Sequence, residues 1–256
     1  MCLLALAWKT HPRWRLLLAG NRDEFHARPT AALGHWADHP QVLAGRDLQS
    51  GGTWAGIDAN GRMAVVTNVR DPAIQVAGAP SRGQLATGFL TGTDDARHQA
   101  LGLLAVAEAF APFNLLLADS DHCEYVSNYP IPRRVSLAPG VHGLSNGDLD
   151  EPWPKTLALK ERLAAWLTSG ESGVTALWQA LADETPAADD RLPDTGVGRE
   201  RERMLSSAFI RNEVYGTRAS TLIAIDHAGH GWISERRFGP DGVPEGETTL
   251  RIGPAA

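Results

Sequence analysis

The sequence predicts an α+β fold in which two antiparallel sheets pack face to face and helices cover them. Strand-like segments occur in adjacent pairs at the start, the middle and the end of the chain, as in hairpins rather than in the alternating order of a doubly wound sheet. The segments with helical spacing are grouped between these pairs. The chain has 256 residues, of which 43% are hydrophobic, and a length of this order supports one large core. We therefore expect a single domain over residues 1–256.

The first half of the chain is predicted to be mostly strand. Residues 2–8 and 15–20 are almost continuously apolar, which is typical of strands buried on both faces. The stretch from Arg28 to Gly52 is rich in Pro, Gly, His and Asp and is predicted to be a long loop. Residues 53–58 and 63–69 flank the dipeptide Asn60-Gly61, which favours a type I′ hairpin turn.

The second half combines helices with three further groups of strands. The expected strands are 114–119, 123–127, 141–144, 221–225 and 231–236. The expected helices are 96–109, 154–167 and 174–181, with Gly170 as the stop of the second. Residues 184–198 read as a surface loop, residues 199–203 alternate in charge like a solvated helix face, and the chain after Gly239 is expected to be frayed.

Composition excludes several classes of partner and compartment. The formal net charge is −6, so neither nucleic acid nor an anionic membrane surface is expected as a partner. No apolar run approaches the roughly 18 to 20 residues of a membrane span. Two cysteines, Cys2 and Cys123, form no disulfide framework, which favours the cytoplasm. The nine histidines show no metal-ligand spacing, and we expect neither a metal nor another cofactor.

Cys2 is the most informative single residue. Methionine aminopeptidase removes Met1 when residue 2 is small, and the cleavage would give Cys2 a free α-amine beside its thiol. The amine titrates near pKa 8 and the thiol near 8.5, about as in model compounds, so one residue would hold both a nucleophile and its general base. The competing interpretation is that Cys2 is a small apolar strand residue.

Four polar residues, Asn21 to Glu24, follow the second predicted strand. Hairpin geometry brings Arg22 and Asp23 near the start of the chain. There a carboxylate could hold the ammonium group of Cys2, and a guanidinium could lower the pKa of its thiol. The alternative is an ordinary surface cluster of salt bridges.

Cys2 followed by Asn21-Arg22-Asp23-Glu24 resembles the NRDE family, whose eukaryotic members are called transport and Golgi organisation proteins. The further matching segments are Gly51–Trp54, Thr67–Arg70, Ser81–Gly83, Gly143–Asn146, Pro152–Lys155 and Tyr215–Arg218, followed by Ser220-Thr221. They cover almost the whole chain in the expected order. The resemblance implies an N-terminal-nucleophile (Ntn) hydrolase fold, a four-layer αββα sandwich, close to the cysteine amidases that cleave bile-salt and penicillin amides.

The resemblance also implies a set of site residues. Arg22 and Asp23 would take the Arg and Asp positions of the amidases, although here they are adjacent, whereas the amidases separate them by about three residues. Asn68 and Asn146 would donate to the oxyanion, a task that suits neutral amides; alternatively, Asn68 ends a strand and Asn146 caps a turn. Arg218 would complete the catalytic group. Substrate binding is assigned to Asn21, Glu24 and Trp54.

Two functions follow as hypotheses. The first is a cysteine amidohydrolase of the Ntn type, which acts on a linear amide C–N bond of a small molecule. The second is a carrier that binds haem or acyl-coenzyme A in the same cleft without turnover. Catalysis needs a free amino terminus and simple binding does not, so the state of Met1 separates them. The sequence determines neither the substrate nor the oligomeric state.

Overall fold

Two antiparallel sheets form the centre of the molecule. The computed structural model describes residues 3–74, 76–171 and 173–253. Sheet A has the strand order β10-β1-β2-β11-β12-β13 in the described residues, and sheet B has the order β3-β4-β5-β6-β7-β8-β9. The strands of sheet A are β1 (Leu3–Trp8), β2 (Trp14–Phe25), β10 (Gly140–Leu144), β11 (Tyr215–Asp226), β12 (Gly231–Phe238) and β13 (Pro244–Ile252). Those of sheet B are β3 (Thr30–His35), β4 (Val42–Asp47), β5 (Ala55–Asp58), β6 (Met63–Asn68), β7 (Phe113–Ala118), β8 (Cys123–Ser127) and β9 (Arg133–Ser136).

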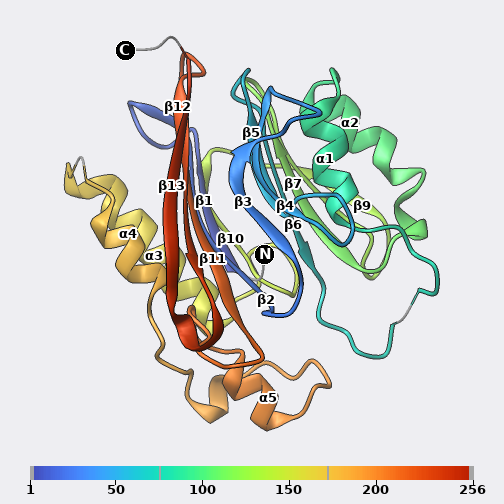
Figure 1. Cartoon of the computed structure of the whole chain (residues 1–256), viewed down its shortest axis with the longest axis vertical. Helices are drawn as coiled ribbons and strands as arrows, with labels where there is room; N and C mark the ends of the chain where they lie inside the picture. Colours follow the sequence, from blue (N-terminus) through green and yellow to red (C-terminus); the bar gives the residue numbers. More distant parts are fainter. Residues whose placement is uncertain (1–2, 75, 172, 254–256) are drawn as a thin grey trace.

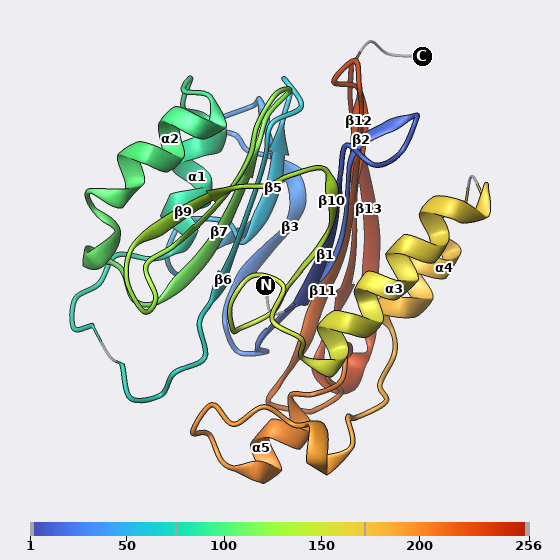
Figure 2. The ribbon, with the colours of Figure 1, turned by 180° about the vertical axis from the view of Figure 1, so that it is seen from behind.

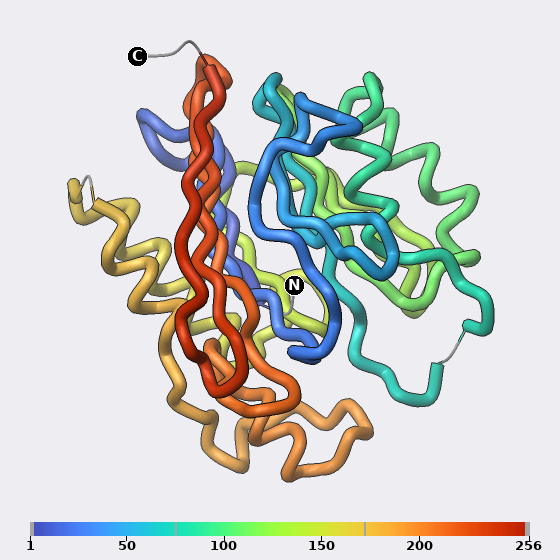
Figure 3. Tube along the Cα trace, viewed as in Figure 1, coloured from blue at the N-terminus to red at the C-terminus, as the bar shows by residue number. Residues whose placement is uncertain are grey.

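Helices cover the outer faces of both sheets, which gives the four predicted layers (Figure 1). Helices α1 (Gly83–Thr91) and α2 (Ala96–Leu104) lie on sheet B, and α3 (Pro154–Ser169) and α4 (Thr175–Leu181) lie on sheet A. A short helix, α5 (Arg199–Met204), lies at one end of the sandwich (Figure 1). The chain passes from sheet A to sheet B between β2 and β3 (Figure 3) and returns between β9 and β10 (Figure 2).

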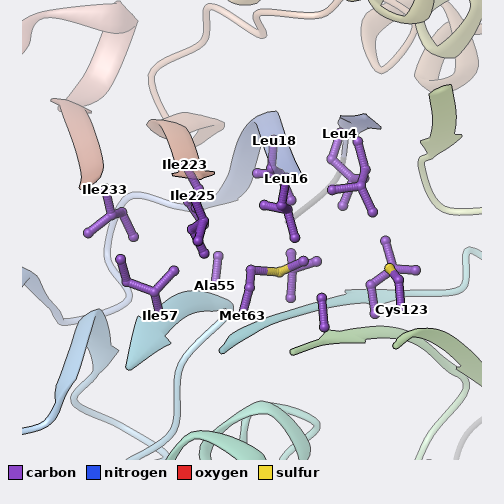
Figure 4. Packing of buried hydrophobic residues seen from close by; sticks show 14 of the residues in the cluster. Leu4, Leu16, Leu18, Ala55, Ile57, Met63, Cys123, Ile223, Ile225 and Ile233 are labelled. Atoms are coloured by element: carbon purple, nitrogen blue, oxygen red, sulfur yellow. The ribbon is translucent and has the colours of Figure 1, made fainter. Parts of the chain in front are cut away.

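The apolar segments at the start of the chain are buried on both faces, as predicted. In β2, Leu16 and Leu18 belong to the cluster between the two sheets, whereas Leu17 and Ala19 pack against the helices on the outer face of sheet A. Successive side chains of a strand point to opposite faces, so a strand in the second layer of four needs apolar residues at every position. Figure 4 shows the cluster between the sheets.

Other sequence predictions were wrong in detail. The stretch 28–52 holds β3 and β4, and the supposedly frayed tail holds β13. The structure also has β9, which was not predicted. Strands β3, β9 and β13 are all edge strands, and an edge strand pairs through its backbone with little need for buried side chains.

Two local predictions also need correction. Asn60 does not have the positive φ that a type I′ turn requires, and Gly61 alone, at φ 72°, is left-handed in this turn. The hairpin therefore closes with a three-residue loop, in which a final left-handed residue favours glycine. The helix expected over 96–109 ends at Leu104. Gly170, at φ 72°, ends α3 as predicted.

Candidate active site

Several of the predicted site residues, Arg22 and Asp23 of β2 and Asn68 of β6 among them, lie at one end of the space between the sheets. Register places Leu3 opposite Asn21 and Leu4 opposite Leu144, so the start of β1 lies between the last residues of β10 and the second half of β2. Cys2, the predicted nucleophile, directly precedes Leu3 and lies outside the described residues.

Arg22 is buried and stacked on an aromatic ring. Its side chain is 6% exposed, and its guanidinium carbon lies 4.3 Å from the centroid of the Trp54 ring. Glu24 Oε2 lies 3.9 Å from Arg22 Nη2. A side chain at Gly45 would overlap the Trp54 ring, because a Cβ there would lie 2.3 Å from it. Gly45 thus makes room for Trp54, and Trp54 supports Arg22 by a cation–π contact.

Asp23 is held in one orientation by the neighbouring strand. Thr217 Oγ1 donates a hydrogen bond to Asp23 Oδ1 at 2.7 Å, and the same hydroxyl accepts one from the backbone N–H of Ile210 at 2.9 Å. Because a backbone N–H can only donate, the Thr217 proton must point to the carboxylate. Asp23 is 5% exposed. A carboxylate fixed in this way is suited to orient a cationic group near the start of β1.

A small polar cleft of about 140 Å³ is lined by Arg22, Asp23, Glu24, Trp54 and Asn68. Its rim includes two of the matching sequence segments, because Gly52 and Gly83 approach each other closely; a Cβ on Gly52 would lie 2.5 Å from the Gly83 carbonyl carbon. The close approach brings residues 81–83 to the same cleft. Five residues that the sequence analysis assigned to catalysis or binding therefore line the same cleft: Arg22, Asp23, Glu24, Trp54 and Asn68.

Asn146 contacts Asn68 directly. Asn146 Nδ2 donates to the backbone oxygen of Asn68 at 3.0 Å and to Asn68 Oδ1 at 3.1 Å. The loop that contains Asn146 follows β10 of sheet A but is bound to sheet B: Thr67 Oγ1 donates to Ser145 O, and Asn114 Nδ2 donates to Gly147 O. These bonds across the two sheets determine where Asn146 lies.

A second, larger pocket of about 650 Å³ lies on the other side of Asn146. Apolar and aromatic residues form part of its wall, and polar and charged groups form the rest. The lining residues include Val69, Arg70, Tyr129, Arg133, Asn146, Asp148, Leu149, Trp153, Asp194 and Thr195. Pockets of about 300 to 1,000 Å³ commonly hold small-molecule ligands.

Two predicted site residues have other contacts. Asn21 is fully buried and faces the helices: its Nδ2 donates to Leu181 O and Ala208 O, and its Oδ1 accepts from Ser220. Arg218 lies at a bulge between β11 and β2, and its Nη1 donates to the backbone oxygen of Arg28 in the loop after β2. Neither residue lines the two pockets.

The sequence interpretation missed Arg70 and Glu202. Arg70 Nη1 pairs with Glu202 Oε2 at 2.7 Å, and the Glu202 side chain is 3% exposed. The run 199–203 was expected to be solvated throughout, and Glu202 contradicts that because it is buried. Arg70 belongs to the matching segment Thr67–Arg70, which was the signal available. Nothing in the sequence marked Glu202.

Neither the second cysteine nor the clustered metal-ligand types among the described residues offer a further reactive site. Cys123 is buried, and burial raises the pKa of its thiol, so it is a poor nucleophile. One group of described residues, Asp95, Asp119 and His122, has ligand atoms within 4.8 Å of one another. Asp119 accepts from the backbone N–H groups of residues 96, 121 and 122, which explains the cluster as turn and cap structure.

Within the described residues, no helix has both the length and the apolar character that crossing a membrane needs.

Solved structures with a similar fold include two variants of a bacterial hydrolase. One variant of the conjugated bile acid hydrolase from Clostridium perfringens aligns with a TM-score of 0.53 and 8% identity over 96% of this chain and 92% of that chain. A second variant aligns with a TM-score of 0.51 and 9% identity over 98% and 92%. Identities this low establish the fold alone, which is that of the Ntn hydrolases.

Sequence comparison finds relatives over almost the full length. The transport and Golgi organization protein 2 homologs of Bos taurus and Homo sapiens are 34% and 33% identical, over 97% and 92% of both chains. The Drosophila melanogaster protein of the same name is 27% identical over 96% of this chain and 95% of its own. A family model described as Transport and Golgi organisation 2 matches residues 1–240.

Proposed function

We propose that this chain, which belongs to the Transport and Golgi organisation 2 family, is a cysteine amidohydrolase of the N-terminal-nucleophile type. Its substrate would be a small molecule with a linear amide C–N bond. One observation supports this most strongly: the buried, oriented carboxylate of Asp23 and the amide of Asn68 line the same small cleft. Arg22 and Asp23 directly follow Asn21, which pairs with Leu3, the first described residue of β1.

In the proposed reaction Cys2 acts after removal of Met1. Its α-amine accepts the thiol proton, and the sulfur attacks the amide carbonyl carbon to form a C–S bond. The carbonyl oxygen becomes an oxyanion, which the amide groups of Asn68 and Asn146 stabilise. The C–N bond then breaks, and the ammonium returns its proton to the leaving amine. Water attacks the thioester with the α-amine as base, which releases the carboxylic acid and restores the thiol.

Asp23 and Arg22 would prepare the nucleophile. Asp23, oriented by Thr217, would hold the α-ammonium group through charge and hydrogen bonding. Arg22, stacked on Trp54, would favour the thiolate by its fixed positive charge. The bulky part of the substrate would occupy the pocket of about 650 Å³ beside Asn146, and only a small polar group fits the cleft of about 140 Å³.

A carrier function is the second candidate, favoured by one observation: the curated relatives are named for transport and Golgi organisation rather than for hydrolysis. In this case the large pocket would hold haem or acyl-coenzyme A without turnover. Blocking the α-amine would then leave binding almost unchanged.

The deciding experiment begins with the amino terminus. Intact-mass measurement of protein made in cells should show loss of Met1, and iodoacetamide should alkylate Cys2 much faster than the buried Cys123. The Met1-free protein is then tested on a broad panel of amides. Turnover that disappears when Met1 is retained supports the hydrolase. No turnover on any amide, together with saturable binding of haem or acyl-coenzyme A, supports the carrier.

A further inference from the structure

We infer that Arg70 is a positioning residue that sets the direction of two amide side chains, so that Asn68, rather than Asn146, donates directly to the oxyanion. The inference rests on the proposed function and refines it. In this arrangement Asn146 acts through Asn68. Arg70 lines the large pocket, and its role in this inference is to position the two amides rather than to contact the reacting atoms.

The direction of each amide follows from the chemistry of arginine. Arg70 Nη2 lies 3.2 Å from Asn146 Oδ1, and a guanidinium group can only donate hydrogen bonds. The oxygen of the Asn146 amide must therefore face Arg70, and its NH₂ group must face the other way. That NH₂ group donates to Asn68 Oδ1 at 3.1 Å, so the oxygen of Asn68 faces Asn146. One arginine thus fixes two amides that could otherwise flip.

The NH₂ group of Asn68 remains available to donate to a ligand. No described residue accepts a hydrogen bond from Asn68 Nδ2, whereas Asn146 Nδ2 is engaged by two oxygens of Asn68. Asn68 lines the small cleft together with Arg22 and Asp23, and Asn146 lines the large pocket. The donor of Asn68 is therefore the one beside the groups that prepare the nucleophile. A chain of hydrogen bonds that begins at a cation also polarises this donor.

Arg70 is itself held firmly. Its Nη1 pairs with Glu202 Oε2 at 2.7 Å, with side-chain exposures of 10% and 3%. Glu202 Oε1 in turn accepts from the backbone and side chain of Thr195, which lines the large pocket. The backbone N–H of Arg70 donates to the backbone oxygen of Asn146 at 2.7 Å. The wall of the large pocket is thereby connected to the oxyanion donor through a buried ion pair.

Arg62 at the opposite end of β6 provides a matched control. Its side chain is 11% exposed, it pairs with Asp58 at 3.5 Å, and its guanidinium lies 4.0 Å from the centroid of the Phe89 ring. Arg70 has the same kinds of partner, an acid and an aromatic ring, the latter being Trp153 at 5.0 Å. Replacing either arginine with glutamine removes a similar buried ion pair, but only Arg70 contacts the amides.

The test compares two reagents on Cys2 of the Met1-free protein. 4-Nitrophenyl acetate acetylates residue 2 through an oxyanion, whereas iodoacetamide alkylates the thiol without forming one. We expect Arg70→Gln to slow acetylation by about tenfold, as loss of a charge-assisted hydrogen bond would, and to leave alkylation unchanged. Arg70→Lys should restore part of the acetylation rate. Arg62→Gln should change neither rate.

A double-mutant cycle tests the order of the relay. Asn68→Ala should slow acetylation by about 100- to 1,000-fold, and Arg70→Gln should add nothing in that background, because the donor it positions is gone. Equal slowing of acetylation and alkylation by Arg70→Gln would overturn the inference. So would full additivity with Asn68→Ala.

A second measurement does not depend on activity. In protein labelled with ¹⁵N-asparagine, the side-chain amide resonances of Asn68 and Asn146 should both shift in Arg70→Gln and stay in place in Arg62→Gln. A shift of the Asn146 resonance alone would contradict the relay. If wild-type Cys2 is never acetylated, the proposed function fails, while the resonances still decide whether Arg70 positions the two amides.

Discussion

The two ends of the space between the sheets are built from the same strands but from different residues. At one end the inward positions are apolar, and the cluster shown in Figure 4 includes Leu16, Ile57, Met63, Ile225 and Ile233. At the other end the inward or terminal positions of the same layers are polar. These polar residues are Arg22, Thr67, Asn68, Asn114 and Asn146, and the hydroxyl of Tyr125, whose ring belongs to the apolar cluster, bonds to Asn114.

Within a single strand, the apolar residues stabilise the fold and the polar residues that follow them contribute to the candidate site. In β2, Leu16 and Leu18 are succeeded along the chain by Arg22, and in β6, Met63 and Val65 are succeeded by Thr67. A buried polar group costs free energy unless it is hydrogen-bonded. At the polar end the buried groups are hydrogen-bonded to one another; the hydroxyl of Tyr125, for example, donates to Asn114 Oδ1. Burial raises the pKa of Tyr125 to about 12.

The largest expected effect is at the polar end. Cys2→Ser should abolish amide turnover, because a hydroxyl is a far weaker nucleophile than a thiolate at neutral pH. The midpoint of thermal unfolding should stay within a degree or two, since the change is small and lies next to the chain terminus. Turnover assays and a thermal melt on the same preparation check both statements. Full activity in Cys2→Ser would remove Cys2 from the mechanism.

The next effect belongs to the apolar end. Leu16 is 1% exposed, and Leu16→Ala should lower the free energy of unfolding by about 2 to 5 kcal/mol, as the loss of a buried leucine does. Leu16 lies six residues before Arg22, or about 20 Å along the strand. The alkylation rate of Cys2 in the folded protein should therefore not change. A denaturant titration measures the first quantity, and coupling between the two ends would appear as an altered alkylation rate.

An effect of about 100-fold is expected from Asp23→Asn. The neutral amide would keep the hydrogen bond from Thr217 but lose the charge that holds the α-ammonium group. Turnover should fall while the fold is retained, and Thr217→Val should produce a smaller loss of the same kind, because it frees the carboxylate to turn. Steady-state assays on both variants decide this. A Thr217→Val enzyme slower than Asp23→Asn would show that the threonine does more than orient the carboxylate.

The smallest expected effect is a pH-dependent change in stability at His142, whose partner Asp150 lies in the loop that contains Asn146. A hydrogen bond to Asp150 raises the pKa of His142 above its ordinary value of 6.5, and Asp150 also binds the backbone of Gly143. A raised pKa means that the stabilisation is fully present below pH 6.5 and is lost as the pH rises through the folded-state value. His142→Gln should therefore lower stability by less than about 1 kcal/mol at pH 6, and less at pH 8. Thermal melts at the two values test the sign, and an equal loss at both would contradict it.

Local sequence determined most of the interior strands, with β4 as an exception, and the long helix α3. The apolar runs of residues 2–8 and 15–20, the spacing of Leu159 and Leu163, and the stop at Gly170 each depend on neighbours in the chain, so the predicted elements match the structure. The residues following the second strand indicated where a cleft would form, and the four layers were anticipated through the resemblance to the NRDE family.

Tertiary structure alone decided the finer site and three of the edge strands in the described residues, whereas the edge strand β10 was predicted from the sequence. Strands β3, β9 and β13 are stabilised by backbone pairing to a neighbour, which leaves no apolar pattern to read. Asn21 and Asp23 are two residues apart, yet one is fastened to a helix layer and the other is oriented by Thr217 of another strand. Arg70 gained Glu202 as its partner across 132 positions of the chain. Contacts of this kind depend on how distant segments pack, which no local pattern records.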